Sequence, residues 1–119
     1  MSSFHLCPVP TGTPLARVAR LDGFWRKGQG VIGMRALPPG EGVWLPGVGA
    51  VHTCFVAFPL DILFLDSEGR TLAAHSSVMP WRLYIAARGA RHTLELGAGT
   101  LARLPGRVGA GDLWELSPE

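Results

Sequence analysis

Two polar side chains in one apolar stretch are the first candidates for chemistry. His52 and Asp61 lie within residues 51–66 (VHTCFVAFPLDILFLD), where nearly every other residue is apolar. An imidazole can act as a general base when a carboxylate fixes its tautomer, so these two could form such a pair. No nucleophile accompanies them. On a strand, Thr53 points to the face opposite His52, and Cys54 shares the face of His52 but lies two residues away. The alternative is that both side chains only satisfy backbone groups at strand ends and at a bend of the chain.

Trp81 and Arg82, which follow a proline, form a second candidate. An exposed tryptophan could stack on a planar ligand while the arginine fork binds an anion. Alternatively, Trp81 closes one end of the core and Arg82 pairs with Asp61 or Glu95. Since an unpaired buried charge costs several kcal/mol, Asp61 must be exposed by a bend, paired, or hydrogen-bonded to backbone N–H groups. We expect Arg82 to be its partner, with a hydrogen bond added by the hydroxyl of Thr53.

The spacing of the other ligand-type residues predicts neither a metal site nor a cofactor site. The histidines lack His-x-His or His-x₃-His spacing, and the two cysteines do not form a Cys-x₂-Cys pair. Residues 97–100 (GAGT) share only glycines with a phosphate-binding loop, because the Lys-Ser/Thr of such a loop is missing. We therefore assign no catalytic residue and expect no metal and no cofactor. The candidate binding residues are His52, Thr53, Asp61, Trp81 and Arg82.

Length, charge and termini limit the class of protein. The 119 residues predict a single domain, residues 1–119, which can bury a core without metal or disulfide. Eleven basic and nine acidic residues give a formal charge of +2, and the arginines are scattered, so we expect no nucleic-acid partner. The apolar stretch is shorter than the about 20 residues that span a bilayer, and the N-terminus lacks a signal-peptide pattern. We expect a cytoplasmic protein with no membrane partner and no disulfide between Cys7 and Cys54.

The positioning elements are predicted to be short strands. Sixteen glycines and ten prolines lie between short apolar runs, as is typical of an all-β chain. We expect a mainly β fold, a small antiparallel β-sandwich or barrel with one or two short helices. Asp66 to Gly69 suits a type I turn that joins two strands of a hairpin. The other expected strands are 43–45, 51–66 (two strands or one bent strand), 70–75, 90–96 and 112–116. Residues 15–21 suit a strand or the start of a helix, of which we expect the strand, and residues 81–85 suit a strand or an ordered loop end. We also expect an extended arm over 1–14, a loop over 76–80, a short helix capped by Asp22 that runs to Arg26 or Lys27, and about two turns of helix over 98–104. Trp25, Trp44 and Trp114 are expected in the core.

Several ordered motifs between residues 30 and 116 resemble those of one protein family. They are GVIG at 30–33, LPPGEG at 37–42, VHT at 51–53 with FPLDILFLD at 58–66, PWR at 80–82 and LELGAGT at 94–100. The chain resembles domain of unknown function 192 (DUF192), also called uncharacterised protein family 0127 (UPF0127). Met34 and Ala57 replace arginines that are frequent in the family, and the segment 108–112 (VGAGD) is two residues longer than the usual turn. The resemblance implies a small β-sandwich or barrel and no established activity.

These observations favour a non-enzymatic β domain that binds a small molecule or a protein partner. The alternative is a hydrolase-like enzyme that uses His52 and Asp61 with Arg82, which requires the three side chains to converge on one open cleft. A third hypothesis, an accessory role in assembly, requires a large apolar patch on the surface.

Overall fold

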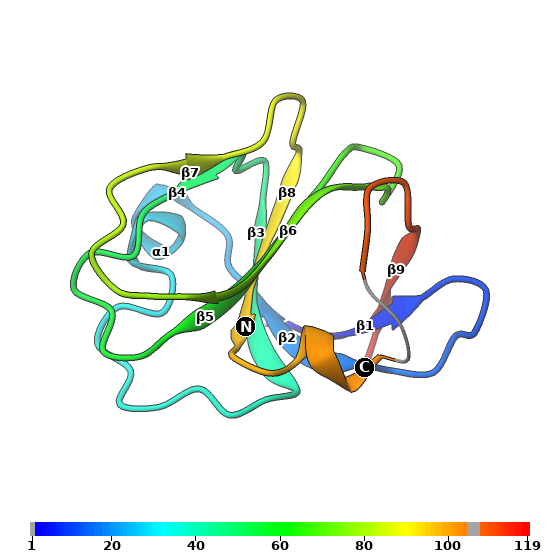
Figure 1. The fold of residues 1–119 in the computed structure, drawn as a ribbon, viewed down its shortest axis with the longest axis horizontal. Coiled ribbons are helices and arrows are strands. Elements are labelled where there is room, and N and C mark those ends of the chain that lie inside the picture. Colours follow the sequence, from blue (N-terminus) through cyan, green and yellow to red (C-terminus); the bar gives the residue numbers. More distant parts are fainter. Residues whose placement is uncertain (1, 105–107) are drawn as a thin grey trace.

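The computed structural model covers the 119-residue chain, and residues 2–104 and 108–119 are described below. Strands dominate this part of the chain (Figure 1). The elements are β1 (Ser3–Pro8), β2 (Ala16–Arg20), α1 (Phe24–Gln29), β3 (Glu41–Pro46), β4 (Ala50–Val51), β5 (Leu60–Leu65), β6 (Thr71–Val78), β7 (Ile85–Ala86), β8 (His92–Gly97), the 3₁₀ turn η1 (Leu101–Arg103) and β9 (Trp114–Pro118).

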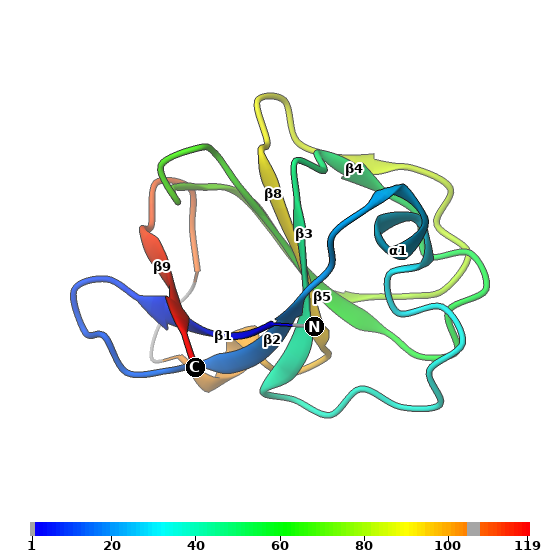
Figure 2. The same cartoon turned by 180° about the vertical axis from the view of Figure 1, so that it is seen from behind.

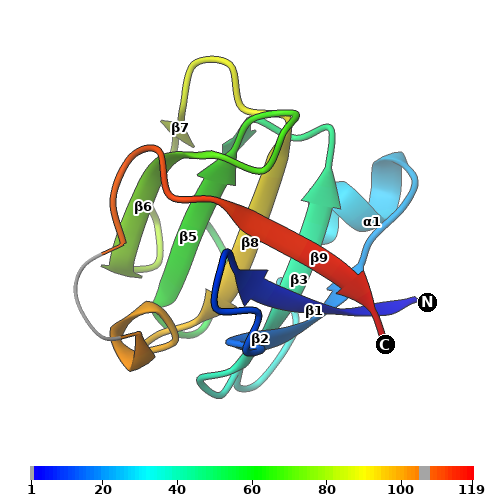
Figure 3. The ribbon, with the colours of Figure 1, turned by 90° about the vertical axis from the view of Figure 1, so that its right-hand side faces the viewer.

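Seven of these strands form one sheet, in the order β6-β5-β8-β3-β2-β1-β9, and β4 pairs with β7 in a separate ribbon. The prediction of a mainly β fold is confirmed. One strand pair differs from the expected antiparallel arrangement, because β2 and β3 run parallel. The sheet curls until its edge strands approach each other (Figure 3), where an isolated β-bridge pairs Arg70 with Leu113 and backbone hydrogen bonds join residues 69–71 to residues 111–114. It is therefore a strongly curved sheet rather than a closed barrel.

The two faces of the sheet carry separate cores. On β5, Leu63 and Leu65 pack in one cluster with residues of β1, β2 and β9, whereas Ile62 and Phe64 pack in the other, which includes residues of β3 and β7. Successive side chains of a strand alternate between faces, so Asp61 belongs to the first face. The α1 helix and the β4–β7 ribbon lie on one side of the molecule, and β9 lies on the other (Figure 2).

Local sequence signals predict most of the elements correctly. The hairpin turn is confirmed: the amide of Gly69 donates to the carbonyl of Asp66, and Asp66 Oδ1 accepts from the amides of Glu68 and Arg70. The apolar stretch 51–66 forms two strands, β4 and β5, separated by an irregular segment. The expected loop 76–80 is wrong up to residue 78, which β6 reaches, and the expected helix over 98–104 is only the single turn η1. Of the expected N-terminal arm, Ser3–Pro8 pairs as β1 between β2 and β9.

The helix α1 differs from the prediction in its cap and its contacts. Its N-cap is Gly23, without a side-chain hydrogen bond, whereas Asp22 pairs with Arg20. The helix buries none of its residues, so the prediction that Trp25 belongs to the core is wrong: its side chain is 84% exposed. Trp44 and Trp114 are buried as expected. Within the described residues, no helix is long and apolar enough to cross a membrane.

Candidate functional site

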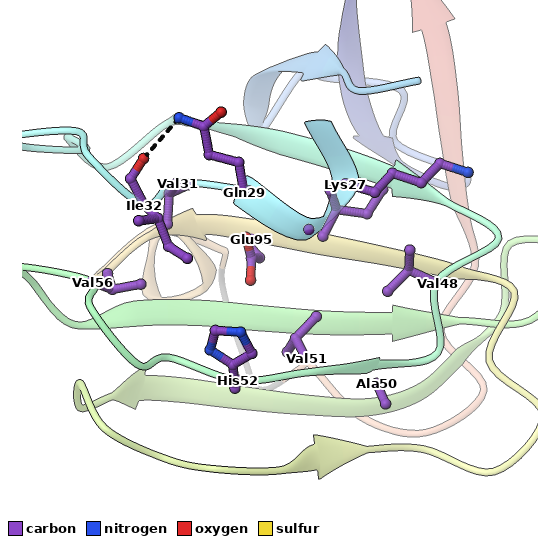
Figure 4. Close-up of a pocket in the computed structure, with 13 residues that line it drawn as sticks. Lys27, Gln29, Val31, Ile32, Val48, Ala50, Val51, His52, Val56 and Glu95 are labelled. Atoms are coloured by element: carbon purple, nitrogen blue, oxygen red, sulfur yellow. Dashed lines mark hydrogen bonds between the residues drawn. The ribbon is translucent and has the colours of Figure 1, made fainter. Parts of the chain in front are cut away.

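A small pocket lies beside α1, between the helix and the segment that begins with β4 (Figure 4). Its volume of about 110 Å³ leaves room for a group of a few heavy atoms. The walls are mostly aliphatic, and the polar lining side chains are Lys27, Gln29, His52 and Glu95. The aliphatic part of the wall is formed by Val31, Ile32, Leu45, Val48, Val51 and Val56.

Glu95 forms the base of this pocket. It lies on β8 between Leu94 and Leu96, which pack on the opposite face of the sheet, so its side chain points toward α1 and β4. The residue is only 4% exposed, and Oε1 has no hydrogen-bond partner within the described residues. Burial raises the pKa of this carboxyl from its usual value of 4.5 to about 7. Glu95 is therefore a buried acid whose protonated and ionised forms are both populated near neutral pH.

The backbone of Gly30 allows the carboxyl to lie against the end of α1. Gly30 has φ +52, a left-handed conformation that glycine adopts without a steric penalty. A Cβ at this position would lie 2.6 Å from Glu95 Oε1, well inside van der Waals contact. Any other residue here would push the carboxyl aside, so this glycine keeps the base of the pocket open.

The rim of the pocket carries basic side chains. His52, which follows β4, is exposed, and its Nδ1 accepts a hydrogen bond of 3.1 Å from the amide of Cys54. This bond leaves the proton of the neutral ring on Nε2. Lys27 on α1 extends along the mouth, away from Glu95 (Figure 4), and forms no ion pair within the described part of the chain. The pocket thus combines a buried acid with basic groups at its opening.

Asp61 does not pair with Arg82, so the expected ion pair is wrong. Its side chain is buried, and its two oxygens accept hydrogen bonds of 2.9 Å from the amides of Ser77 and Leu101. The carboxylate thus satisfies backbone donors, one of the three alternatives that the sequence allowed. Asp61 also faces the opposite side of the sheet from Glu95, which excludes a direct pairing with His52 in the pocket.

Thr53 connects two loops instead of supporting Asp61. Its hydroxyl donates to the carbonyl of Met79 over 2.7 Å and accepts from the amide of Arg82 over 2.9 Å. Its backbone amide donates to the carbonyl of Arg82, and its carbonyl accepts from the amide of Trp81. The fully buried Thr53 therefore fastens residues 52–55 to residues 79–82.

The fastened loops expose a group of large apolar side chains, which we call the aromatic surface. Its members are between 61% and 81% exposed: Phe55, Met79, Trp81, Leu83 and Tyr84. The rings of Phe55 and Trp81 are 4.8 Å apart, and both residues have a positive φ, 64° and 70°, which is strained for a side chain of this size. Trp81 is therefore exposed, and it does not close the core.

The structure brings together only some of the candidate residues. His52 lines the pocket, Thr53 fastens the loops beneath the aromatic surface, Trp81 and Arg82 are exposed on that surface, and Asp61 lies in the other core. Sequence reasoning named Glu95 only as an alternative partner of Arg82 and missed its place in the pocket. Its position between two leucines of an apolar strand was the available signal.

A larger hollow and the other ligand-type side chains of the described residues carry less chemistry. A hollow of about 590 Å³ lies between residues 8–15, 103–104 and 108–114, but its charged side chains, Arg103 and Asp112, are exposed. No group of three or more His, Cys, Asp or Glu side chains gathers in residues 2–104 and 108–119.

The comparisons with known proteins identify the family. The family model DUF192, described as "Uncharacterized ACR", matches residues 10–112. The chain belongs to this family. A UPF0127 protein of Thermococcus sibiricus is 30% identical over 70 residues, which are 59% of this chain and 45% of the relative. A UPF0127 protein of Pyrococcus abyssi is 32% identical over 59 residues, half of each chain. The chain thus spans about half the length of these two relatives.

Two solved structures share the fold of this DUF192 member. A Sinorhizobium meliloti protein, provisionally called a transcription regulator, has a TM-score of 0.82 and 25% identity, with 97% of this chain and 94% of the other covered. A Novosphingobium aromaticivorans protein of unknown function has a TM-score of 0.75 and 21% identity, with 93% and 83% covered.

Proposed function

We propose that this DUF192 chain is a non-enzymatic binding domain that holds a small molecule in the pocket above Glu95. The observation that carries the proposal is the buried carboxyl whose Oε1 lacks a hydrogen-bond partner within the described residues. A buried polar atom without a partner costs about 1 to 3 kcal/mol. A ligand that offers a hydrogen-bond donor recovers this cost, so the pocket is prepared for binding.

The same geometry favours binding over the hydrolase hypothesis. That hypothesis needs His52, Asp61 and Arg82 in one cleft, yet Asp61 and Arg82 do not line the pocket that His52 borders. Both oxygens of Asp61 are already engaged by backbone amides. His52 therefore has no carboxylate from this set to orient it as a base.

The test is a fragment screen followed by NMR, with the methyl groups of Val31, Ile32 and Val51 as reporters. We expect compounds with hydrogen-bond donors to shift these resonances in a saturable way. The Glu95→Leu variant should lose binding because it replaces the carboxyl by an apolar group. Glu115→Gln on β9 is the matched control, since this glutamate is exposed and does not line the pocket.

A screen in which no compound shifts the reporters would contradict the proposal. So would ligands that bind Glu95→Leu and the parent equally well, because the carboxyl would then have no part in binding.

A protein partner is the second candidate, favoured by the aromatic surface. Large exposed apolar patches mark interaction sites. Residues with a strained backbone are kept in place by the surrounding structure and cluster at functional sites. Arg82 lies within the surface, and residues 42–60 and 69–94 contain no Asp or Glu. We therefore propose a partner segment that alternates acidic with apolar side chains.

Trp81 provides the measurement for this candidate. A short peptide that alternates glutamate and leucine should change the fluorescence of the parent but not that of Trp81→Ser, and a lysine–leucine peptide should have no effect. Equal responses to both peptides would refute charge complementarity. Concentration-dependent dimerisation in sedimentation that Trp81→Ser abolishes would instead assign the surface to a second copy of the chain.

A further inference from the structure

We propose that the ligand of the Glu95 pocket is a small zwitterion, with an ammonium group that binds Glu95 and an anionic group that binds at the rim beside Lys27. This inference rests on the proposed function and names the chemical class that the pocket selects. It follows from three features: the base, the rim and the walls.

The base of the pocket calls for a compact donor with positive charge. Glu95 Oε1 is an unpartnered acceptor within the described residues and is enclosed by the backbone of Gly30. A carboxylate forms its strongest hydrogen bonds with cationic donors, and a buried carboxylate gains most from a cation that shares its enclosure. A primary ammonium has three donors on one atom and fits where a planar guanidinium would need a wider space.

The rim calls for the opposite charge. Lys27 and His52 border the opening, and Lys27 has no acidic partner within the described residues. Residues 23–40 and 42–60, which supply all of the pocket lining except Glu95, contain no Asp or Glu. A ligand that carries only a positive charge would be repelled by this basic opening, whereas a ligand with an anionic end is attracted by it. The two ends of the pocket therefore select two charges on one molecule.

The walls determine the chemistry of the segment that joins the two charged groups of the ligand. They consist mainly of valine, isoleucine and leucine side chains, which favour methylene groups. A volume of about 110 Å³ limits the buried part to a few heavy atoms. An ω-amino acid or an aminoalkyl phosphate with a short alkyl chain meets both conditions.

Glu95 makes the binding dependent on pH. The titratable groups that face it across the pocket are Lys27 on α1 and His52 after β4, while the lining residues from β3 and from 28–32 carry no ionisable side chain. With a pKa of about 7, roughly one tenth of the carboxyl is ionised at pH 6 and nine tenths at pH 8. Because the ammonium prefers the carboxylate, affinity should rise about tenfold between these pH values, with release of a proton on binding near pH 6.

Titration calorimetry with four probes tests the proposal. The probes are 4-aminobutanoate, 3-aminopropyl phosphate, n-butylammonium and butanoate. We expect one of the two zwitterions to bind at least tenfold more tightly than either single-charge probe, and their order identifies the anionic group as carboxylate or phosphate. Glu95→Gln, which keeps the size of the side chain, should weaken zwitterion and butylammonium binding at least tenfold and remove most of the pH dependence.

The Lys27→Met variant tests the other end independently, because it changes a partly exposed residue of a helix that buries none of its side chains. It should weaken zwitterion binding and leave butylammonium binding unchanged or stronger. Parent-like melting curves at pH 5 establish that both variants are folded.

Butanoate binding as tight as that of 4-aminobutanoate, or zwitterion binding that Glu95→Gln leaves unchanged, would overturn the assignment of the ammonium to Glu95. Unchanged zwitterion binding in Lys27→Met would overturn the assignment of the anion. Failure of all four probes while another compound of the fragment screen occupies the pocket would refute this inference alone. Failure of every compound would refute the proposed function as well.

Discussion

Glu95→Gln should stabilise the protein above neutral pH and leave its stability almost unchanged in acid. In the parent, burial holds the pKa of Glu95 at about 7, whereas the same carboxyl in the unfolded chain titrates near 4.5. The folded protein therefore binds the proton more tightly than the unfolded chain does. Between these two pH values the stability of the parent falls as the pH rises, because unfolding releases a proton.

The magnitude follows from the two pKa values. Their difference, multiplied by about 1.4 kcal/mol per pH unit, gives about 3 kcal/mol. This stabilisation is fully present below pH 4.5 and is lost once the pH exceeds about 7. The neutral amide of glutamine does not titrate, so any constant effect of the substitution cancels when the difference between variant and parent is followed with pH.

Urea unfolding at pH 5, 6, 7 and 8 measures this difference. Between pH 5 and pH 8 the variant should gain about 2 to 3 kcal/mol relative to the parent, which corresponds to about 10 °C in melting temperature for a domain of this size. Glu115→Gln, an exposed position, should differ from the parent by less than about 0.5 kcal/mol throughout. A constant difference between Glu95→Gln and the parent at all four pH values would refute the raised pKa and remove the basis of the pH-dependent ligand binding.

Four further substitutions probe the scaffold, by chemical denaturation or by thermal melting. Asp61→Ala should cost about 3 to 5 kcal/mol because it removes the buried carboxyl that accepts hydrogen bonds from the amides of Ser77 and Leu101. Arg82→Ala should cost less than about 0.5 kcal/mol; similar losses in the two variants would support the ion pair instead. Thr53→Val should cost about 1 to 3 kcal/mol and loosen the aromatic surface, detectable as faster proteolysis of its loops; parent-like stability and cleavage would contradict the role of its hydroxyl. Gly97→Ala should prevent folding or lower the melting temperature severely, because a Cβ would lie 2.2 Å from the carbonyl oxygen of Pro38; a parent-like melting curve would show that the chain can give way there.

The sequence predicts elements well where their signals are local. The turn at Asp66 to Gly69 depends on residues within the turn, and its flanking apolar runs form β5 and β6 as expected. The parallel pairing of β2 with β3 depends on how residues 21–40 return the chain, which no local pattern encodes. The prediction for Trp25 was wrong for a related reason: apolar type predicts burial on average, but within the described part of the chain α1 buries none of its residues.

The sequence indicated the region of the candidate site but not its central residue, Glu95. His52 could be found because a polar residue in an apolar stretch stands out, and it does border the pocket. Glu95 also interrupts an apolar run, yet an acid between two strand leucines usually faces solvent on a sheet with one covered face. Here both faces of the central strands are covered, so the alternation of polar and apolar residues does not indicate exposure.

Asp61 and Glu95 show why the fate of a buried acid depends on distant parts of the chain. They lie on the paired strands β5 and β8, where Asp61 is opposite Leu96 and Glu95 is opposite Ile62. The amides that satisfy Asp61 belong to residues 16 and 40 positions further along the chain, on β6 and at the start of η1. On the other face, the end of α1 brings the glycine backbone of Gly30 against Glu95 and supplies no donor to Oε1. Two acids in neighbouring strands thus differ, because different elements cover the two faces of the sheet. The carboxyl of Asp61 is hydrogen-bonded to backbone amides, whereas Oε1 of Glu95 has no hydrogen-bond partner within the described residues.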